Sequence, residues 1–235
     1  MKGSRLAAAL VALPLIALLA GLGTWQLQRL AWKNELIATM EARLDAPPIA
    51  LDEALALASA ARAWRRVAAT GRFLHDRQVA LYRLSAEGEP GYLILTPLEL
   101  PDGGLVLVDR GHVPEGLAEP EMRPGSEPEG EVRVTGVLRG PERPGAFTNA
   151  NDPERGQWHW IDLDALSDVA GGPLLPAVIH ADADPEGGWP RGGQALVRPR
   201  NEHLGYALTW YALAAAAAVI YVLLLLRGRG REEAR

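Results

Sequence analysis

The sequence predicts an α+β membrane protein, with one transmembrane helix at each end and a mainly antiparallel β domain outside the membrane between them. Three observations lead to this prediction. Apolar residues make up 48% of the chain and are concentrated at the two termini. The middle is rich in Gly and Pro, which favours turns between short strands. Arginines follow the C-terminal apolar segment, as is typical on the cytoplasmic side of a membrane.

Residues 6–24 form the first predicted span. The segment is uncharged from Leu6 to Leu22, and a spanning helix needs about 20 apolar residues, with about 17 as a lower limit. A cleaved signal peptide is the competing interpretation, but its apolar core usually has only about 7–15 residues. Helical spacing of apolar residues continues through residues 30–44, and Pro47-Pro48 ends it.

Residues 204–226 form the second predicted span. The segment is rich in Ala and Leu, and a basic tail, residues 227–235, follows it directly. Positive residues prefer the cytoplasm, so this tail and residues 1–5, with Lys2 and Arg5, are both predicted to be cytoplasmic.

Residues 25–203 are therefore predicted to lie on the outer face. No Arg- and Ser-rich presequence precedes the first span, which favours a bacterial inner membrane and a periplasmic domain over mitochondrial import.

The middle of the chain predicts a sheet with a few short helices. Residues 51–61 and Asp164–Val169 are expected to be helical, and residues 101–104 to form a hairpin turn. Residues 115–131 are charged and rich in Pro and Gly, so they are expected to form a loop. The expected strands are short β-prone runs separated by turn residues: Arg65–Phe73, Gln78–Leu84, Tyr92–Leu98, Leu105–Val108, Val132–Leu138, Trp158–Leu163 and Ala177–His180.

Composition excludes several classes of function. A net charge of −5 argues against a nucleic-acid partner. The absence of Cys excludes disulfides, iron–sulfur clusters and thiolate metal sites. No nucleophile–base motif is present, so no catalytic residue is predicted and an anchored periplasmic enzyme is the weakest class. Asp152, Asp162 and Asp164 are the acids that such an enzyme would use. We expect instead that Asp152 caps a turn and that the other two lie at a helix start.

Four of the five histidines are expected to be structural. His75 lies in a predicted turn, and His112 and His180 lie at strand ends. His159 stands between two tryptophans in a predicted strand, so its ring should face away from both indoles.

His203 differs because it immediately precedes the second span, where an ionisable side chain is a functional candidate. Two interpretations stay open at this point. In one, the imidazole bonds to water or lipid headgroups. In the other, it is an axial ligand of a haem at the outer end of the helix pair, and Arg198 and Arg200 pair with the propionates or with headgroups.

A helical second span would place His203 on a face of mostly small residues. Small residues let membrane helices approach closely, and Gly21 and Gly23 offer the matching positions on the first span. The residues on this face are His203, Ala207, Trp210, Ala214 and Ala218.

Several motifs, in order along nearly the whole chain, resemble the surfeit locus protein family, whose members are assembly factors of cytochrome c oxidase. The resemblance rests on Gly23–Arg29 with Trp32-Lys33, Gly71–Phe73, Gly91–Leu98, Val108–Pro114, Asn151–Pro153 with Trp158–Asp162, and Asn201–Tyr211. Two positions depart from the family pattern: Asp109 replaces an Asn and His112 replaces a Trp. A partner contact transferred from the family is therefore weakest on this hairpin.

The resemblance implies a non-enzymatic factor that binds haem a transiently and delivers it to the large oxidase subunit. Its implied partners are that subunit, the machinery of haem a synthesis and membrane lipid. His203 is the expected ligand of the haem iron, and Tyr206, Trp210, Arg200 and Arg198 are the other expected contacts. The alternative is a structural clamp that holds the oxidase subunit during assembly without touching haem.

Overall fold

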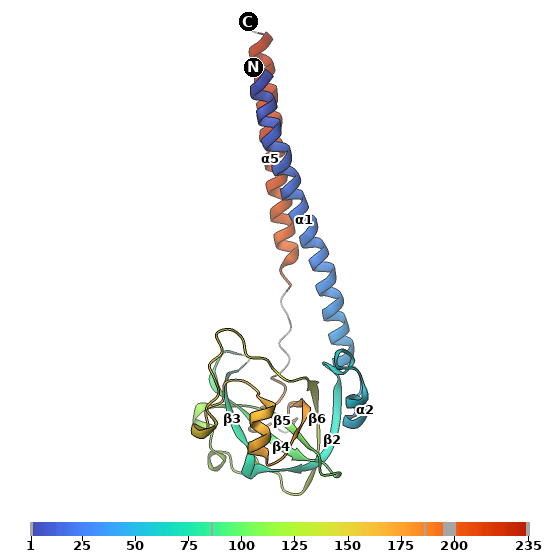
Figure 1. Cartoon of the computed structure of the whole chain (residues 1–235), viewed down its shortest axis with the longest axis vertical. Coiled ribbons are helices and arrows are strands. Elements are labelled where there is room, and N and C mark those ends of the chain that lie inside the picture. The colour runs from blue at the N-terminus through green and yellow to red at the C-terminus, as the bar shows by residue number, and fades with distance from the viewer. Residues whose placement is uncertain (1, 86, 186, 195–200, 234–235) are drawn as a thin grey trace. The chain divides into compact units, whose positions relative to one another are not determined.

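The structure, a computed structural model, describes residues 2–85, 87–185, 187–194 and 201–233. It divides into two compact units. One comprises Met1–Thr39 with Pro199–Arg235 and holds the two long helices; the other, Met40–Arg198, holds the sheet. In Figure 1 the helices are the blue and red ribbons.

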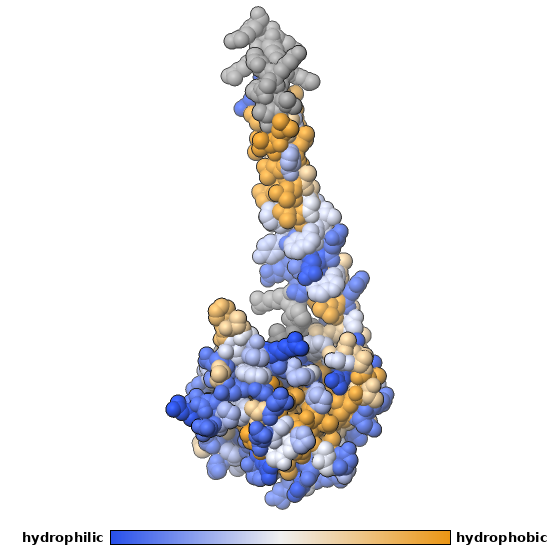
Figure 2. Space-filling model, in the orientation of Figure 1, coloured by the Kyte–Doolittle hydropathy of each residue, from blue (hydrophilic) through white to orange (hydrophobic). Residues whose placement is uncertain are grey.

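The helical unit consists of α1 (Lys2–Leu44) and α5 (His203–Glu233). Both are long and apolar enough to cross a membrane, over Ala9–Leu44 and His203–Arg227. The apolar surface is visible as orange side chains in Figure 2. The 43 residues of α1 correspond to roughly 65 Å at about 1.5 Å per residue. The helix therefore continues well beyond a hydrocarbon layer of about 30 Å, as the helical spacing of residues 30–44 predicts.

The two helices face each other along a seam with coiled-coil spacing. Along α1 the seam positions alternate in steps of three and four: Ala9, Ala12, Ile16, Leu19, Gly23, Gln26, Leu30, Lys33 and Ile37. Along α5 they are His203, Ala207, Trp210, Ala214, Ala217 and Tyr221.

Gly23 is the point of closest approach in this seam. A Cβ at Gly23 would lie 2.9 Å from Cζ of Tyr211, whereas one at Gly21 would meet nothing within 4 Å. Ala207 and Ala214 are buried in the same seam. The predicted close approach of the helices is thus confirmed at Gly23, although the group that meets it is the Tyr211 ring and not a small residue, and the prediction was wrong for Gly21.

The second unit is built on one mixed, seven-stranded sheet in the order β1-β2-β6-β7-β5-β4-β3. β1–β2 and β5–β7 pair in parallel and the other neighbours are antiparallel. The strands are β1 (Ile49–Ala50), β2 (Arg66–Phe73), β3 (Val79–Leu84), β4 (Pro90–Glu99), β5 (Leu105–Pro114), β6 (Glu131–Arg139) and β7 (Leu174–Ala181).

The sheet also closes on itself. Arg72 and Phe73 of β2 pair with Glu99 and Leu98 of β4. This pairing joins β2, β6, β7, β5 and β4 into a small barrel, which the sequence alone did not predict. The expected mainly antiparallel α+β domain is confirmed.

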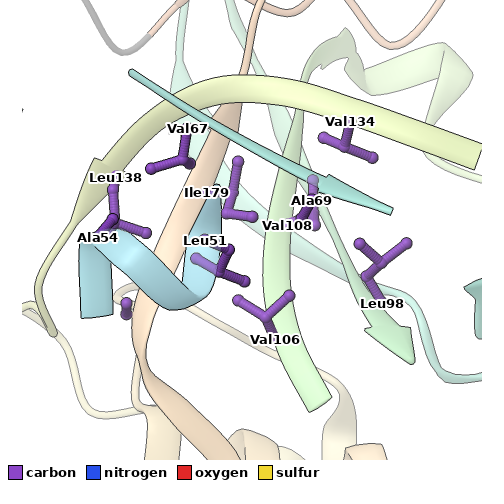
Figure 3. Close-up of a cluster of buried hydrophobic side chains, with 11 residues drawn as sticks. Leu51, Ala54, Val67, Ala69, Leu98, Val106, Val108, Val134, Leu138 and Ile179 are labelled. Atoms are coloured by element: carbon purple, nitrogen blue, oxygen red, sulfur yellow. The ribbon is translucent and has the colours of Figure 1, made fainter. Parts of the chain in front are cut away.

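The barrel interior holds the first of two hydrophobic cores. Val106 and Val108 point inward from β5, and Ala177 and Ile179 point inward from β7. Figure 3 shows Val106, Val108 and Ile179 converging with Leu98 and with residues of β2 and β6. Successive side chains of a strand point to opposite faces, so alternate residues of β5 and β7 reach the barrel interior.

The intervening residues build the second core on the outer face. Leu107 and Val178 pack there with Leu81 and Leu95, under Trp158 and the helix α4 (Leu163–Ala170). Asp162 caps α4 by accepting a hydrogen bond from the backbone N–H of Ala165, as predicted for this carboxylate. Asp152 likewise caps the turn that contains Arg155.

Two predicted elements differ from the structure. The helix expected over residues 51–61 is two separate helices, α2 (Leu51–Ala56) and α3 (Ser59–Arg62).

The remaining short elements are 3₁₀ turns: η1 (His75–Arg77), η2 (Glu115–Leu117), η3 (Pro120–Met122) and η4 (Pro153–Arg155).

The strand predicted at Trp158–Leu163 was wrong. Only Trp158 forms a bridge, to Leu81. The backbone N–H groups of His159 and Trp160 donate instead to the side chain of Asn151, and that of Ile161 donates to Glu142. Side chains thus replace a neighbouring strand as the hydrogen-bond partners of this segment. The orientation predicted for the His159 ring assumed a strand, so that prediction no longer applies.

Candidate functional site

His203, the first residue of α5, faces α1 across the seam. Its Nδ1 lies 2.7 Å from Oε1 of Gln26. Because a carbonyl oxygen accepts and does not donate, Nδ1 must carry the proton of the neutral ring, and Nε2 then carries the lone pair. Among the described residues no hydrogen bond involves Nε2. The contact therefore sets the tautomer that a metal ligand requires.

The His203 ring opens into a pocket of about 300 Å³ at the end of the seam. Its lining consists of Gln26, Lys33, Glu202, His203 and Tyr206. A pocket of this size lies at the lower end of the range for ligand sites, about 300–1,000 Å³. It therefore fits one edge of a large planar ligand rather than the whole molecule.

Two further polar contacts flank the His203–Gln26 pair. Asn201 Nδ2 donates to Oδ1 of Asn34 at 2.8 Å. The hydroxyls of Thr24 and Tyr211 lie 2.9 Å apart. In an apolar seam such contacts specify register, because sliding the helices would separate all of the partners. The site is consequently held by both helices.

The structure brings only some of the predicted site residues to the pocket. Tyr206 lines the pocket with His203. Trp210 lies half-buried in the seam and is not part of the lining. Arg198 and Arg200 lie outside the described residues.

The prediction missed Gln26, Lys33 and Glu202. A signal for Gln26 and Lys33 was present in the sequence. Both fall on the spacing of three and four residues that runs through Gly23 and Leu30, which would have placed them on the face toward α5.

The other histidines do not form a metal centre, and no group of His, Cys, Asp and Glu among the described residues could hold a metal ion. His180 Nδ1 lies 2.8 Å from Oδ2 of Asp109, and both side chains are buried. The other oxygen of Asp109 accepts the N–H of Gly111. Asp109 and His112 are each only 3% exposed, so the two departures from the family pattern are interior changes.

These features define a class: a membrane protein with two candidate spans and, between them, a closed mixed barrel. The chain belongs to the SURF1 family, whose model matches residues 13–215. A SURF1-like protein of Monosiga brevicollis is 39% identical over 247 aligned positions, covering 100% of this chain and 93% of that protein. Surfeit locus protein 1 of Takifugu rubripes is 38% identical (86% of this chain, 90% of that protein). The Homo sapiens protein of the same name is 35% identical (88% and 74%).

Proposed function

We propose that the chain is an assembly factor for haem–copper cytochrome c oxidase and that it binds haem a transiently at the outer end of the helix pair. Family membership supports the first part. The observation that carries the second is the His203–Gln26 contact, which holds the imidazole at the wall of a pocket; the neutral tautomer that fits this contact keeps its lone pair on Nε2. Imidazole nitrogen is a common axial ligand of haem iron.

The residues that line the pocket fit part of a haem a molecule in their chemistry, and the pocket is large enough for one edge of it. His203 would ligate the iron, and Tyr206 would lie against the ring. Lys33 brings a positive side chain to the pocket, as a propionate requires, whereas Glu202 opposes it. A small open pocket holds only part of the haem, and this suits delivery to the large oxidase subunit better than permanent storage.

The orientation of the chain belongs to the same proposal. Both termini would be cytoplasmic and the barrel would lie on the outer face, periplasmic if the membrane is a bacterial inner membrane. The relatives named above come from eukaryotes, so the compartment stays a prediction. Its test is the labelling of cysteines introduced singly at Ser85 and Arg227 with a membrane-impermeant thiol reagent. The proposal expects labelling of intact cells at position 85 only, and the chain has no cysteine of its own.

Complementation tests the assembly function. A host lacking its own family member is supplied with this chain or with its His203→Ala variant, and the oxidase is purified. The proposal expects haem a-filled oxidase with the unmodified chain and oxidase with most of its haem a missing with His203→Ala. Oxidase that is poorly assembled but fully haem-loaded with the variant would favour the structural clamp instead. His159→Ala, in the barrel unit, is the matched control.

A further inference from the structure

A second cavity, of about 460 Å³, lies wholly within the barrel unit. It is formed at one end of the barrel, where β2 and β7 finish, and loop residues 124–126, 128, 182–185 and 187–190 contribute to its lining. The haem proposal does not use this cavity. We call it the barrel-mouth pocket.

Arg110 of β5 is the central side chain of this pocket. It follows Val106 and Val108 on the inward-facing side of the strand. Its guanidinium lies 5.0 Å above the ring of Phe73, and Nη2 donates to the backbone carbonyl of Ser126. Nη1 is buried and has no hydrogen-bond acceptor among the described residues. A buried donor without an acceptor costs about 1–3 kcal/mol, and more when the group is charged.

Arg110 also sits in an unfavourable electrostatic environment. Burial and, to a smaller extent, the nearby Arg123 together lower its pKa to about 10, while Glu127 acts in the opposite direction. Arg123 is only 4% exposed, and within the described part of the chain its guanidinium donates to neutral oxygens, of Ser126 and Ala118. Burial lowers the pKa of Arg123 as well. The half-buried Arg110 and the buried Arg123 thus lie near Glu127, and Glu119 and Glu121 also act on Arg123.

Other groups in the lining complete the charge pattern. Arg133 is exposed and forms no ion pair within the described part of the chain. Asp182 also lines the cavity, but its carboxylate is paired with Arg66. Asp184 adds a second carboxylate. The lining therefore favours one negative group beside Arg110 and disfavours a polyanion, which would approach both acids.

Apolar residues form the rest of the wall. Phe73, Val134 and Trp189 line the cavity together with several prolines. A ligand that matches this lining has one planar anionic group and a small apolar body. Carboxylate is the anion that fits a guanidinium fork most closely, through two parallel hydrogen bonds.

We propose that the barrel-mouth pocket binds a single carboxylate group carried on a small apolar body, with Arg110 as its main partner and Arg133 as a secondary one. Two sources present the same chemistry: a free aromatic or aliphatic monocarboxylate, and the C-terminal carboxylate of a protein chain.

The test is a titration of the ¹⁵N-labelled full chain in detergent, followed through the arginine side-chain N–H signals. The probes are 3-phenylpropionate and the dipeptide N-acetyl-alanyl-phenylalanine, each compared with its own amide. We expect saturable shifts with both acids and none with either amide. The tighter acid identifies the source.

Variants show whether Arg110 is responsible. Arg110→Met should weaken binding of the acids at least tenfold, and Arg133→Gln should weaken it about threefold. The second variant keeps the test valid if Arg110→Met does not fold. Arg72→Gln is the matched control, because Arg72 is the exposed neighbour of Phe73 and is not part of the lining. Equal binding of acids and amides, or binding unchanged in both lining variants, would overturn the proposal.

Discussion

The helix pair and the barrel place their polar contacts in different ways. In the helix pair, three polar contacts stand at one end of a seam of small and apolar side chains, and they link the two helices directly. In the barrel, the interior is apolar, and polar groups lie further along β5 and β7, as Asp109, Arg110 and His180 do. The barrel therefore owes its stability to apolar packing, whereas the polar contacts of the helix pair determine which residues meet.

The largest effect expected from this difference is in the barrel core. Leu98 is fully buried where β2 and β4 close the barrel. Leu98→Ala should lower the free energy of unfolding by about 2–5 kcal/mol, because it leaves a cavity. Urea unfolding followed by near-ultraviolet circular dichroism measures this loss. Leu84→Ala, at a site 55% exposed, should change stability by less than about 0.5 kcal/mol.

The next largest effect concerns the buried Asp109–His180 pair. Asp109→Ala removes the acceptors for His180 Nδ1 and for the N–H of Gly111. We expect a loss of at least about 2 kcal/mol, because two buried donors are left unpaired and each costs about 1–3 kcal/mol.

Asp109→Asn separates the two contacts, because an amide oxygen can still accept from Gly111. Its cost in the same urea assay should be clearly smaller than that of Asp109→Ala. Equal losses for the two substitutions would contradict this account of the pair.

A smaller effect is expected in the helix seam. Gly23→Ala brings a methyl group to 2.9 Å from the Tyr211 ring, so it should displace the ring and its contact with Thr24. Overpacking of this kind costs about 1–3 kcal/mol, enough to reduce helix pairing several-fold. Pairing is measured by a short thiol crosslinker between Asn34→Cys and Asn201→Cys in this cysteine-free chain. Gly21→Ala is the control, and an equal drop with it would refute the seam.

The smallest effect is expected at the barrel surface. Arg72 and Glu99 form an exposed ion pair across the β2–β4 closure, 3.0 Å apart. Exposed pairs contribute only about 0–1 kcal/mol. Arg72→Gln should therefore lower stability by less than about 0.5 kcal/mol in the urea assay. A loss approaching that of Leu98→Ala would mean that charge, and not core packing, holds the barrel closed.

The local features of the fold were predictable from the sequence. The apolar stretches gave both long helices, and period-two runs gave most strands. The caps at Asp152 and Asp162 followed from the preference of short acidic side chains for helix starts. Each of these depends on residues that are near neighbours in the chain.

The features that the sequence did not predict depend on partners that are distant in the sequence. Residues 158–163 are β-prone, but their backbone donors bond to Asn151 and Glu142 instead of a strand. Closure of the barrel depends on β2 meeting β4, about 26 residues further along the chain. The partner of His203 lies 177 positions away, so composition alone did not reveal Gln26, although the periodicity of α1 contained it.

The most direct test of the central claim is the absorption spectrum of the chain purified from cells that also make haem a. The unmodified chain should carry haem with the spectrum of an imidazole ligand, and His203→Ala should lose most of it. Gln26→Leu should keep the pairing of the helices but bind less haem, because the His203 ring is no longer held in one tautomer, whereas Gln28→Leu, an exposed neighbour, should bind normally. A haem content and spectrum unchanged in His203→Ala would contradict the claim.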